Sequence, residues 1–372
     1  GRYRSAMGDI TLPTNVAELT PAYLTSMLKH GGHLAGGEVV DVDAAIVGTG
    51  VGFVGQLARL ELTFTGDAGG LPSTMVAKFP TDFPMAKDIA QAYGFYRNEA
   101  ECYRQAGHGE LGVPTPDIFL SEVSADDRDT LILMQDLSDG RMADQVVGAS
   151  LADAEAVIDV GAQLHATWWE SPKLADLAWL CPLNNPAYKA GQKQYQDSIP
   201  VFTEMFAHLA PAGTLDVTER IGRQLADSYD WIVANRPLTL AHSDFRLDNF
   251  FFDRPGVPIT VIDWQLTCRA AGAGDICYFI VQSLSTETRH QHGDALLHRW
   301  HQGLLDRGVT GYTFDDAWDD FRRSVLMLMS IPVVGASNLD PANERGTQLL
   351  ECMVSRALQA IADYDCADML LH

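Results

Sequence analysis

Two short stretches of the chain end in side chains that could bind a metal ion and accept a proton. One apolar run, Leu-Thr-Leu-Ala, leads into a polar loop with His242, Asp244 and Asn249, and a second, Ile-Thr-Val-Ile, ends at Asp263. A hairpin-like link with a Pro-Gly turn joins them, so both ends can present their polar groups to one small volume. Carboxylate and amide oxygens suit Mg²⁺. The sequence therefore predicts a magnesium site at these strand ends.

Kinase-type phosphoryl transfer requires this set of residue types. One Asp accepts the proton of the attacking hydroxyl, an Asn five residues later holds a metal ion, and an Asp on the next strand bridges metal and phosphates. Asp244 would be the base, Asn249 and Asp263 the metal ligands, and Arg246 could neutralise charge on the transferred phosphoryl group. For each residue alone, the alternative is a buried strand pair with a satisfied histidine and surface carboxylates.

The motif His-x-Asp-x-x-x-x-Asn, followed by a strand that ends in Asp, resembles that of aminoglycoside phosphotransferases and choline kinases. Asp-Phe-Arg-Leu-Asp-Asn-Phe-Phe-Phe and Ile-Asp-Trp-Gln are similar to the ecdysteroid-kinase-like (CHK kinase-like) branch of bacterial phosphotransferases. The resemblance covers nearly the whole chain after Met7. It implies an α+β, protein-kinase-like bilobal fold, with a β-rich N-lobe that has one pairing helix and a larger, mainly α-helical C-lobe. Ser243 stands where these kinases usually have glycine, so a local difference in the loop is expected.

A glycine-rich segment near the N-terminus contains Gly50, Gly52 and Gly55 in the spacing of a dinucleotide-binding fingerprint. That fingerprint must open a helix. Here an alternating run, 56–64, follows instead, and it predicts a strand. A glycine loop between two antiparallel strands is typical of kinases, in which its backbone amides cover the ATP phosphates. A plain glycine-rich hairpin is the alternative.

The resemblance also implies a nucleotide site. Lys78, at the end of a predicted strand, matches the kinase lysine that reaches the α- and β-phosphates, and Glu99 matches its helical partner, with Glu101 as the fallback. The link between the lobes would include Gln135 and Leu137, whose backbone would bind adenine.

The expected domains follow from this link. Residues 1–7 look like a vector-derived remnant, residues 8–135 would form the nucleotide-binding N-lobe, and residues 136–372 would form the C-lobe with the catalytic loop and acceptor site. Asp275 matches the family's aspartate that opens a helix and braces the catalytic loop. A simple acidic residue at a helix N-terminus is the alternative.

Four aromatic residues near a proline-punctuated stretch of the C-lobe are candidates for either the core or an acceptor pocket: Trp168, Trp169, Trp179 and Tyr188.

The overall composition limits the classes of partner that the protein can bind. The net charge of −23, from 49 acidic and 26 basic residues, argues against nucleic acid, because a phosphate backbone would be repelled. The six cysteines form no Cys-x-x-Cys pair, so a zinc site is unsupported. The sequence shows neither an apolar run long enough for a membrane span nor a signal peptide. We expect a cytoplasmic monomer or homodimer.

These observations predict an ATP-dependent phosphotransferase, with GTP as the alternative nucleotide, that uses Mg²⁺ to phosphorylate a hydroxyl of a small molecule. Aminoglycosides, sterol-like alcohols, choline-like alcohols and sugars remain open as acceptors. One rival is a metal-dependent hydrolase with His242, Asp244 and Asp263 as ligands, since histidine favours transition metals. The other is a nucleotide-binding pseudoenzyme.

Overall fold

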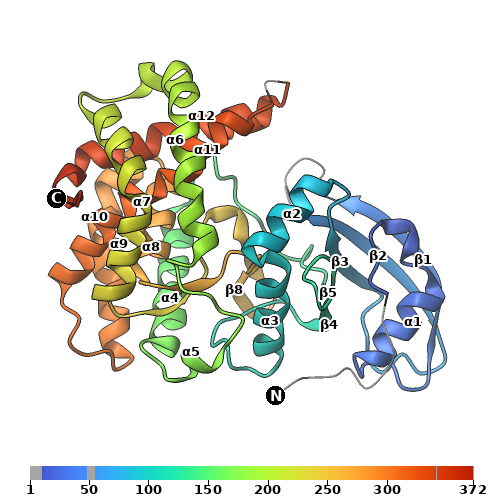
Figure 1. Cartoon of the computed structure of the whole chain (residues 1–372). Coiled ribbons are helices and arrows are strands. Elements are labelled where there is room, and N and C mark those ends of the chain that lie inside the picture. The colour runs from blue at the N-terminus through green and yellow to red at the C-terminus, as the bar shows by residue number, and fades with distance from the viewer. Residues whose placement is uncertain (1–10, 48–54, 341, 372) are drawn as a thin grey trace. The chain divides into compact units, whose positions relative to one another are not determined.

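The structure is a computed structural model that describes residues 11–47, 55–340 and 342–371. It divides into two compact units, which are described separately below (Figure 1). The first runs to Glu110 and includes Thr115–Asp139, and the second comprises Leu111–Pro114 and Gly140 onward. The four residues of Leu111–Pro114 therefore belong to the second unit.

The first unit is built on one antiparallel sheet in the order β1-β2-β3-β5-β4. Its strands are β1 (Glu38–Val47), β2 (Gly55–Thr65), β3 (Thr74–Pro80), β4 (Ile118–Val123) and β5 (Thr130–Gln135). Its helices are the 3₁₀ turn η1 (Val16–Glu18), α1 (Pro21–His30), α2 (Pro84–Tyr93) and α3 (Phe95–Gly107).

Alternation along the strands separates the two faces of this sheet. Met75, Ala77 and Phe79 of β3 are fully buried in a core cluster that also contains Leu24 and Leu28 of α1. Since neighbouring strand residues point to opposite faces, Lys78 lies on the face away from this cluster. The predicted cap of α1 is present, because the Thr20 side chain accepts a hydrogen bond from the backbone of Tyr23.

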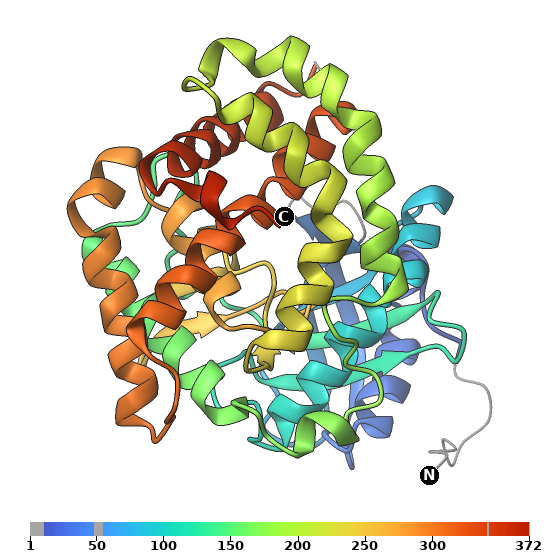
Figure 2. The ribbon, with the colours of Figure 1, turned by 60° about the vertical axis from the view of Figure 1, so that its left-hand side comes forward.

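The second unit is mainly helical (Figures 1 and 2). Its α-helices are α4 (Leu151–Trp168), α5 (Lys173–Asp176), α6 (Pro186–Phe206), α7 (Thr214–Asn235), α8 (Ala273–Gln282), α9 (Thr286–Asp306), α10 (Phe314–Leu328), α11 (Ser330–Asn338) and α12 (Glu344–Asp363). Its 3₁₀ turns are η2 (Ala207–Leu209), η3 (Leu247–Asn249) and η4 (Cys366–Met369). Helices α6 and α7 pack against each other, and α8 packs against both α9 and α10.

Two small strand pairs carry the polar motif of the second unit. Strand β6 (Thr239–Ala241) pairs with β9 (Cys268–Ala270), and β7 (Phe250–Arg254) pairs with β8 (Val257–Val261). The segment expected to be only a link therefore contains a strand of its own, β7. The Pro-Gly turn closes the β7–β8 hairpin, with Gly256 at a φ of 75°.

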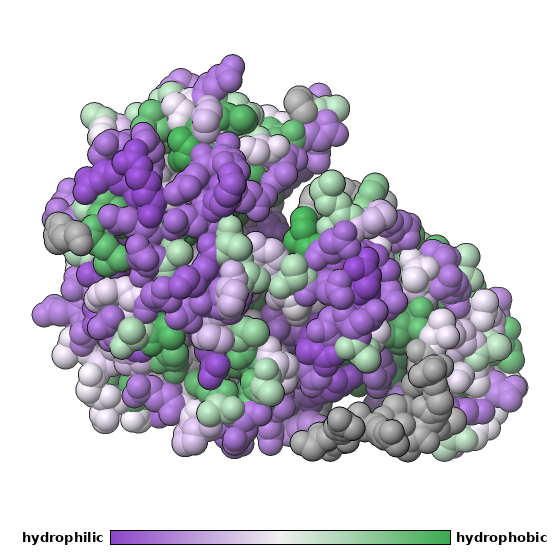
Figure 3. All heavy atoms as spheres, viewed as in Figure 1, coloured by the Kyte–Doolittle hydropathy of each residue, from purple (hydrophilic) through white to green (hydrophobic). Residues whose placement is uncertain are grey.

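Hydrophilic side chains cover most of the visible surface of both units, in keeping with the large net charge (Figure 3). Among the helices that the structure describes, none has both the length and the apolar character that a membrane span requires.

Candidate active site

Strand β6 delivers the polar loop that the sequence singled out. Its three residues are buried, and His242 follows directly with no exposed surface. The ring Nε2 of His242 donates to the carbonyl of Ile262 (2.9 Å), and its Nδ1 accepts from the backbone N–H of Asp244 (3.2 Å). Because both ring nitrogens are engaged, His242 bridges the loop and the end of β8.

Asp275, in the first turn of α8, holds the backbone of the same loop. Its carboxylate accepts the N–H groups of His242 (2.7 Å) and Ser243 (2.8 Å). It also contacts Nε2 of His165 (3.1 Å), whose Nδ1 accepts from the indole N–H of Trp300 (3.0 Å). All five groups are buried or half-buried. Asp275 thus braces the loop, as the resemblance implied, and His165 has a structural role there.

Asp244 is buried and surrounded by donors. The amide Nδ2 of Asn249 donates to its backbone carbonyl (2.7 Å) and its Oδ2 (2.9 Å), and Tyr278 of α8 is hydrogen-bonded to its carboxylate. Burial opposes ionisation of Asp244, but the nearby Arg246 charge and these hydrogen bonds outweigh it, so the pKa of Asp244 lies below its ordinary value of 3.8. Asp244 is therefore an ionised carboxylate, a hydrogen-bond acceptor.

Arg246 lies beside this carboxylate. Its Nε is 3.3 Å from Oδ1 of Asp244, and its Nη1 donates to Asp248 (2.9 Å). The charge of Asp244 raises the pKa of Arg246 above its usual range despite burial. Arg246 is a fixed positive charge next to the candidate base.

Asn249 and Asp263 could provide oxygen ligands for a metal ion. The Asn249 amide nitrogen is directed at Asp244, and its Oδ1 has no hydrogen bond to any described residue. Ile262, the residue before Asp263, donates its N–H to the backbone carbonyl of Asn249 (3.0 Å), which ties the end of β8 to the loop. The charge of Asp263 also acts on Arg246. This donor set, an amide oxygen and carboxylates, fits Mg²⁺.

The same geometry disfavours the hydrolytic metal site. His242 would have to release one of its two hydrogen bonds to become a ligand. Within residues 11–47, 55–340 and 342–371, no group of three His, Cys, Asp or Glu side chains is arranged to hold a metal ion.

In the first unit, Lys78 forms an ion pair with Glu99 of α3. The Lys78 Nζ lies 2.8 Å from Oε1 and 2.7 Å from Oε2, and only 13% and 3% of the two side chains are exposed. Glu101, the fallback, instead binds Arg104 (2.6 Å). Gly55 is paired with Pro80, and a Cβ on it would come 3.6 Å from Cε of Lys78, so the first residue of β2 lies against the lysine stem. Gly50 and Gly52 lie outside the described residues.

The two predicted adenine-binding residues end the first unit. The Gln135 N–H donates to the carbonyl of Asp117 (2.8 Å), so this N–H is not available to bind adenine. The Leu137 N–H, in contrast, donates to no described residue, although the side chain is buried. Between them, Asp136 forms an ion pair with Arg59 (2.7 Å) that fixes the segment.

A cavity of about 230 Å³ lies in the second unit, next to the loop. Its lining is mainly apolar and comes from α6, α7, α8, α10, α11 and the segment 266–271, and it includes Ser243, Asp275 and Tyr278. Tyr278, a residue of the cavity wall, also bonds to Asp244, so one side chain links the cavity to the candidate base. Of the four aromatic candidates, Tyr188 lines this cavity, whereas Trp168 is buried and donates to the carbonyl of Leu111.

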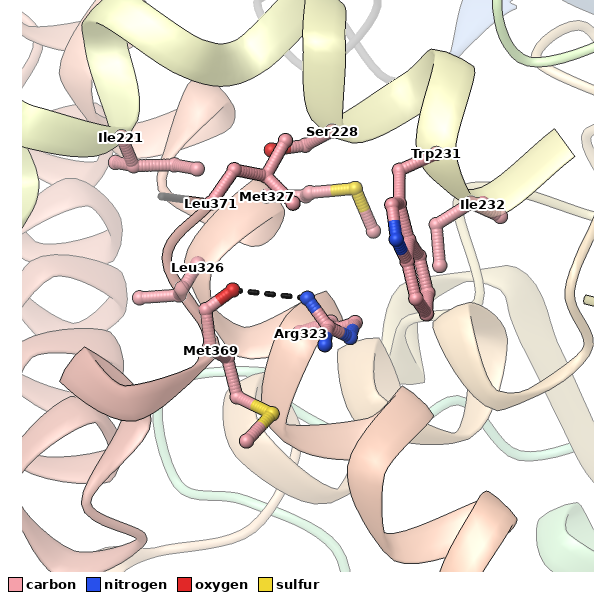
Figure 4. A pocket seen from close by; sticks show the side chains of 9 residues that line it. All are labelled: Ile221, Ser228, Trp231, Ile232, Arg323, Leu326, Met327, Met369 and Leu371. Atoms are coloured by element: carbon pink, nitrogen blue, oxygen red, sulfur yellow. Dashed lines mark hydrogen bonds between the residues drawn. The ribbon is translucent and has the colours of Figure 1, made fainter. Parts of the chain in front are cut away.

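A second cavity, shown in Figure 4, is far smaller, at about 10 Å³. Arg323 points into it, stacks on Trp231 at 3.9 Å from the ring centroid, and donates to the carbonyl of Met369 (2.9 Å). The space suits about one water molecule. The hydrogen bond from Arg323 anchors the C-terminal segment. The cavity itself is too small for a substrate.

Sequence reasoning missed Tyr278 and Cys268 as members of the site. Tyr278 lies three residues after Asp275, so the helical spacing i, i+3 could have placed both on one face of α8. Cys268 is brought to Ser243 by the β6–β9 pairing, for which the sequence offered no signal.

Comparison with known proteins gives the family. Residues 49–308, more than half of the chain, match the model of the ecdysteroid kinase-like family. No curated protein sequence matches the chain.

Among solved structures, the chain is similar to choline kinase from Cryptosporidium parvum, with 9% identity, 88% of this chain and 91% of that chain covered, and a TM-score of 0.53. It also matches macrolide 2'-phosphotransferase from Brachybacterium faecium (16% identity, 89% and 97% covered, TM-score 0.46). A third match is ethanolamine kinase from Plasmodium vivax (11%, 86% and 82%, TM-score 0.48). The likeness to choline kinase confirms the predicted α+β, protein-kinase-like fold. The chain belongs to the ecdysteroid kinase-like family, and the prediction of a small-molecule kinase or phosphotransferase is confirmed at the level of family and fold.

Proposed function

We propose that the protein transfers the γ-phosphoryl group of ATP to a hydroxyl of a small, uncharged and mainly apolar alcohol. The observation that carries this proposal is the position of Asp244. Its carboxylate is buried and ionised, and it bonds to Tyr278, which lines the neighbouring cavity. An alcohol in that cavity can therefore present a hydroxyl to a ready acceptor of its proton.

The chain's own groups have separate roles in this proposal. Asp244 orients the attacking hydroxyl and takes its proton. Arg246, held beside Asp244, offsets negative charge that develops on the phosphoryl group. His242 and Asp275 keep the loop in place through the hydrogen bonds described above.

On the first unit, Lys78 would bind the nucleotide phosphates, oriented by Glu99, and the free N–H of Leu137 would bind adenine, with the Gln135 carbonyl as a further candidate. Asn249 and Asp263 would hold Mg²⁺, with the carboxylate of Asp244 nearby. When bound, Mg²⁺ neutralises phosphate charge in the transition state. The residues 8–135 and 136–372 thus remain our proposal for a nucleotide-binding and an acceptor-binding lobe.

The cavity supports an uncharged acceptor over a polycationic one. Asp275 contributes a carboxylate to its lining, but both oxygens already accept backbone N–H groups. The neighbouring surface comes largely from side chains such as Leu266, Ala270, Met327 and Ile331. An aminoglycoside's ammonium groups would be desolvated there without a matching charge, which is costly. Sterol-like alcohols fit this surface better than choline-like or sugar acceptors.

ATP consumption with a panel of alcohols tests the proposal. The panel should span apolar ring alcohols, choline, sugars and aminoglycosides, each with ATP or GTP and with or without Mg²⁺. We expect Mg²⁺-dependent phosphorylation of apolar alcohols. In Asp244→Asn, kcat should fall by about 10²–10⁴-fold with Mg·ATP affinity retained, because Asn249 and Asp263 remain.

Other outcomes would favour the rivals. Loss of bound metal in Asp244→Asn would support the hydrolytic site. ATP binding without turnover on any alcohol, equally in parent and variant, would support the pseudoenzyme.

A further inference from the structure

Ser243 combines an unfavourable backbone conformation with a position on the cavity wall. Its φ is 65°, in the left-handed region that side chains with a Cβ rarely adopt. The Asp275 carboxylate imposes this shape by accepting its N–H (2.8 Å). Glycine would meet the backbone requirement with less strain. Backbone conformations of this kind cluster at functional sites, so the side chain of Ser243 is a candidate for a functional role.

The Ser243 hydroxyl has only a weak hydrogen-bond partner. Its Oγ lies 3.2 Å from Sγ of Cys268, and a thiol is a poor donor and a poor acceptor. Burial raises the pKa of Cys268 to about 12, so the sulfur is an uncharged thiol. A ligand oxygen would be a better partner for Ser243 than this thiol.

Three other hydroxyls of the lining, those of Ser324, Tyr188 and Tyr278, are bonded to oxygen acceptors. The hydroxyl of Ser324 donates to the carbonyl of Asp320 (2.7 Å), and that of Tyr188 donates to the carbonyl of Leu266 (3.3 Å). Tyr278 is bonded to Asp244. Against a mainly apolar wall, Ser243 therefore offers an exchangeable hydrogen bond, one residue before the candidate base.

We propose that Ser243 determines acceptor specificity by binding a second oxygen of the substrate while Asp244 engages the reacting hydroxyl. The preferred acceptor is then an apolar molecule with at least two oxygens, such as a diol or hydroxyketone. This inference rests on the proposed function, since it assigns the cavity to the acceptor.

Matched pairs of alicyclic diols and mono-alcohols test it, from cyclohexane-1,4-diol and cyclohexanol up to two- and three-ring homologues. Binding is measured by calorimetry, and phosphorylation is measured in parallel. The parent should prefer the diol. In Ser243→Ala and Ser243→Gly, this preference should fall by about tenfold, the order of one lost hydrogen bond.

Two controls separate binding from structure. Ser324→Ala, which removes another wall hydroxyl that is already bonded to the carbonyl of Asp320, should keep the diol preference. Ser243→Gly should also keep or raise Tm by ~1–3 °C, because it relieves the left-handed strain. A purely structural serine predicts the reverse: Tm falls in Ser243→Gly, and the diol preference is unchanged.

The possible results separate the proposed role of Ser243 from the proposed phosphotransferase function. No diol preference in the parent, no binding of either compound, or a preference that survives in both Ser243 variants would overturn the role of Ser243, even if alcohols are phosphorylated. A Ser243-dependent preference in binding without any phosphorylation would overturn the proposed function and leave the role of Ser243 standing.

Discussion

Replacing Asp275 by Asn removes a charge from the loop that carries Asp244, with almost no change of size. The carboxylate accepts two backbone N–H groups, from His242 and Ser243, and it is only 2% exposed. Asn keeps one acceptor oxygen, so one buried N–H group loses its partner at a cost of about 1–3 kcal/mol. The remaining bond also loses its charge assistance. We expect the second unit to lose about 2–4 kcal/mol of unfolding free energy.

Tryptophan fluorescence is a selective probe for this change, because all seven tryptophans lie between Trp168 and Trp318, in the second unit. Urea unfolding would compare the parent, Asp275→Asn and the matched control Asp315→Asn, an exposed aspartate in the first turn of α10. The control should change stability by less than about 0.5 kcal/mol. Hydrogen exchange at the His242 and Ser243 amides should accelerate only in Asp275→Asn. If stability stays within 1 kcal/mol of the parent and these amides keep their protection, Asp275 does not brace the loop.

Three further substitutions test other parts of the site and the core. Glu99→Gln should weaken ATP binding roughly tenfold or more by calorimetry, because the Lys78 charge loses its partner, whereas Glu101→Gln should not. Asp263→Asn should abolish Mg²⁺-dependent activity and keep the fold, since Asn tolerates the φ of 66°. The control is Asp253→Asn, at an exposed residue with a φ of 58°. If the metal dependence of Asp263→Asn equals that of the parent, Asp263 is not part of the metal site. Burial raises the pKa of Asp320 to about 6, so its contribution is full below pH 4 and lost as pH rises through 6. The second unit should therefore lose about 2 kcal/mol between pH 4 and 7, a dependence that Asp320→Asn abolishes in fluorescence-monitored urea unfolding.

Much of the fold was predictable because the relevant signals are local. The alternation after Gly55 predicted a strand where a glycine fingerprint alone suggested a dinucleotide site, and β2 is that strand. Thr20 and Ser150 predicted helix starts, and both side chains cap α1 and α4. The pairing of Lys78 with Glu99 came from the resemblance, because residues 21 positions apart on a strand and a helix have no spacing rule.

The sequence by itself determined which polar groups the loop brings together. Asp244 and Asn249 are five residues apart on one tight turn, so their neighbourhood follows from chain connectivity, and the hydrogen bond between them is local. Even there, burial and the charge of Arg246 act most on the pKa of Asp244, and the further hydrogen bond from Tyr278 comes from another element.

Only the tertiary structure decided the acceptor cavity and the role of Ser243. The wall gathers side chains from α6, α7, α8, α10 and α11, which lie more than 140 residues apart in the chain, from Tyr188 to Ile331. Which faces of these helices meet depends on packing among the helices, and no single helix carries that information. The left-handed φ of Ser243 likewise comes from Asp275, 32 residues away, because a distant carboxylate holds its N–H against the local preference of the chain.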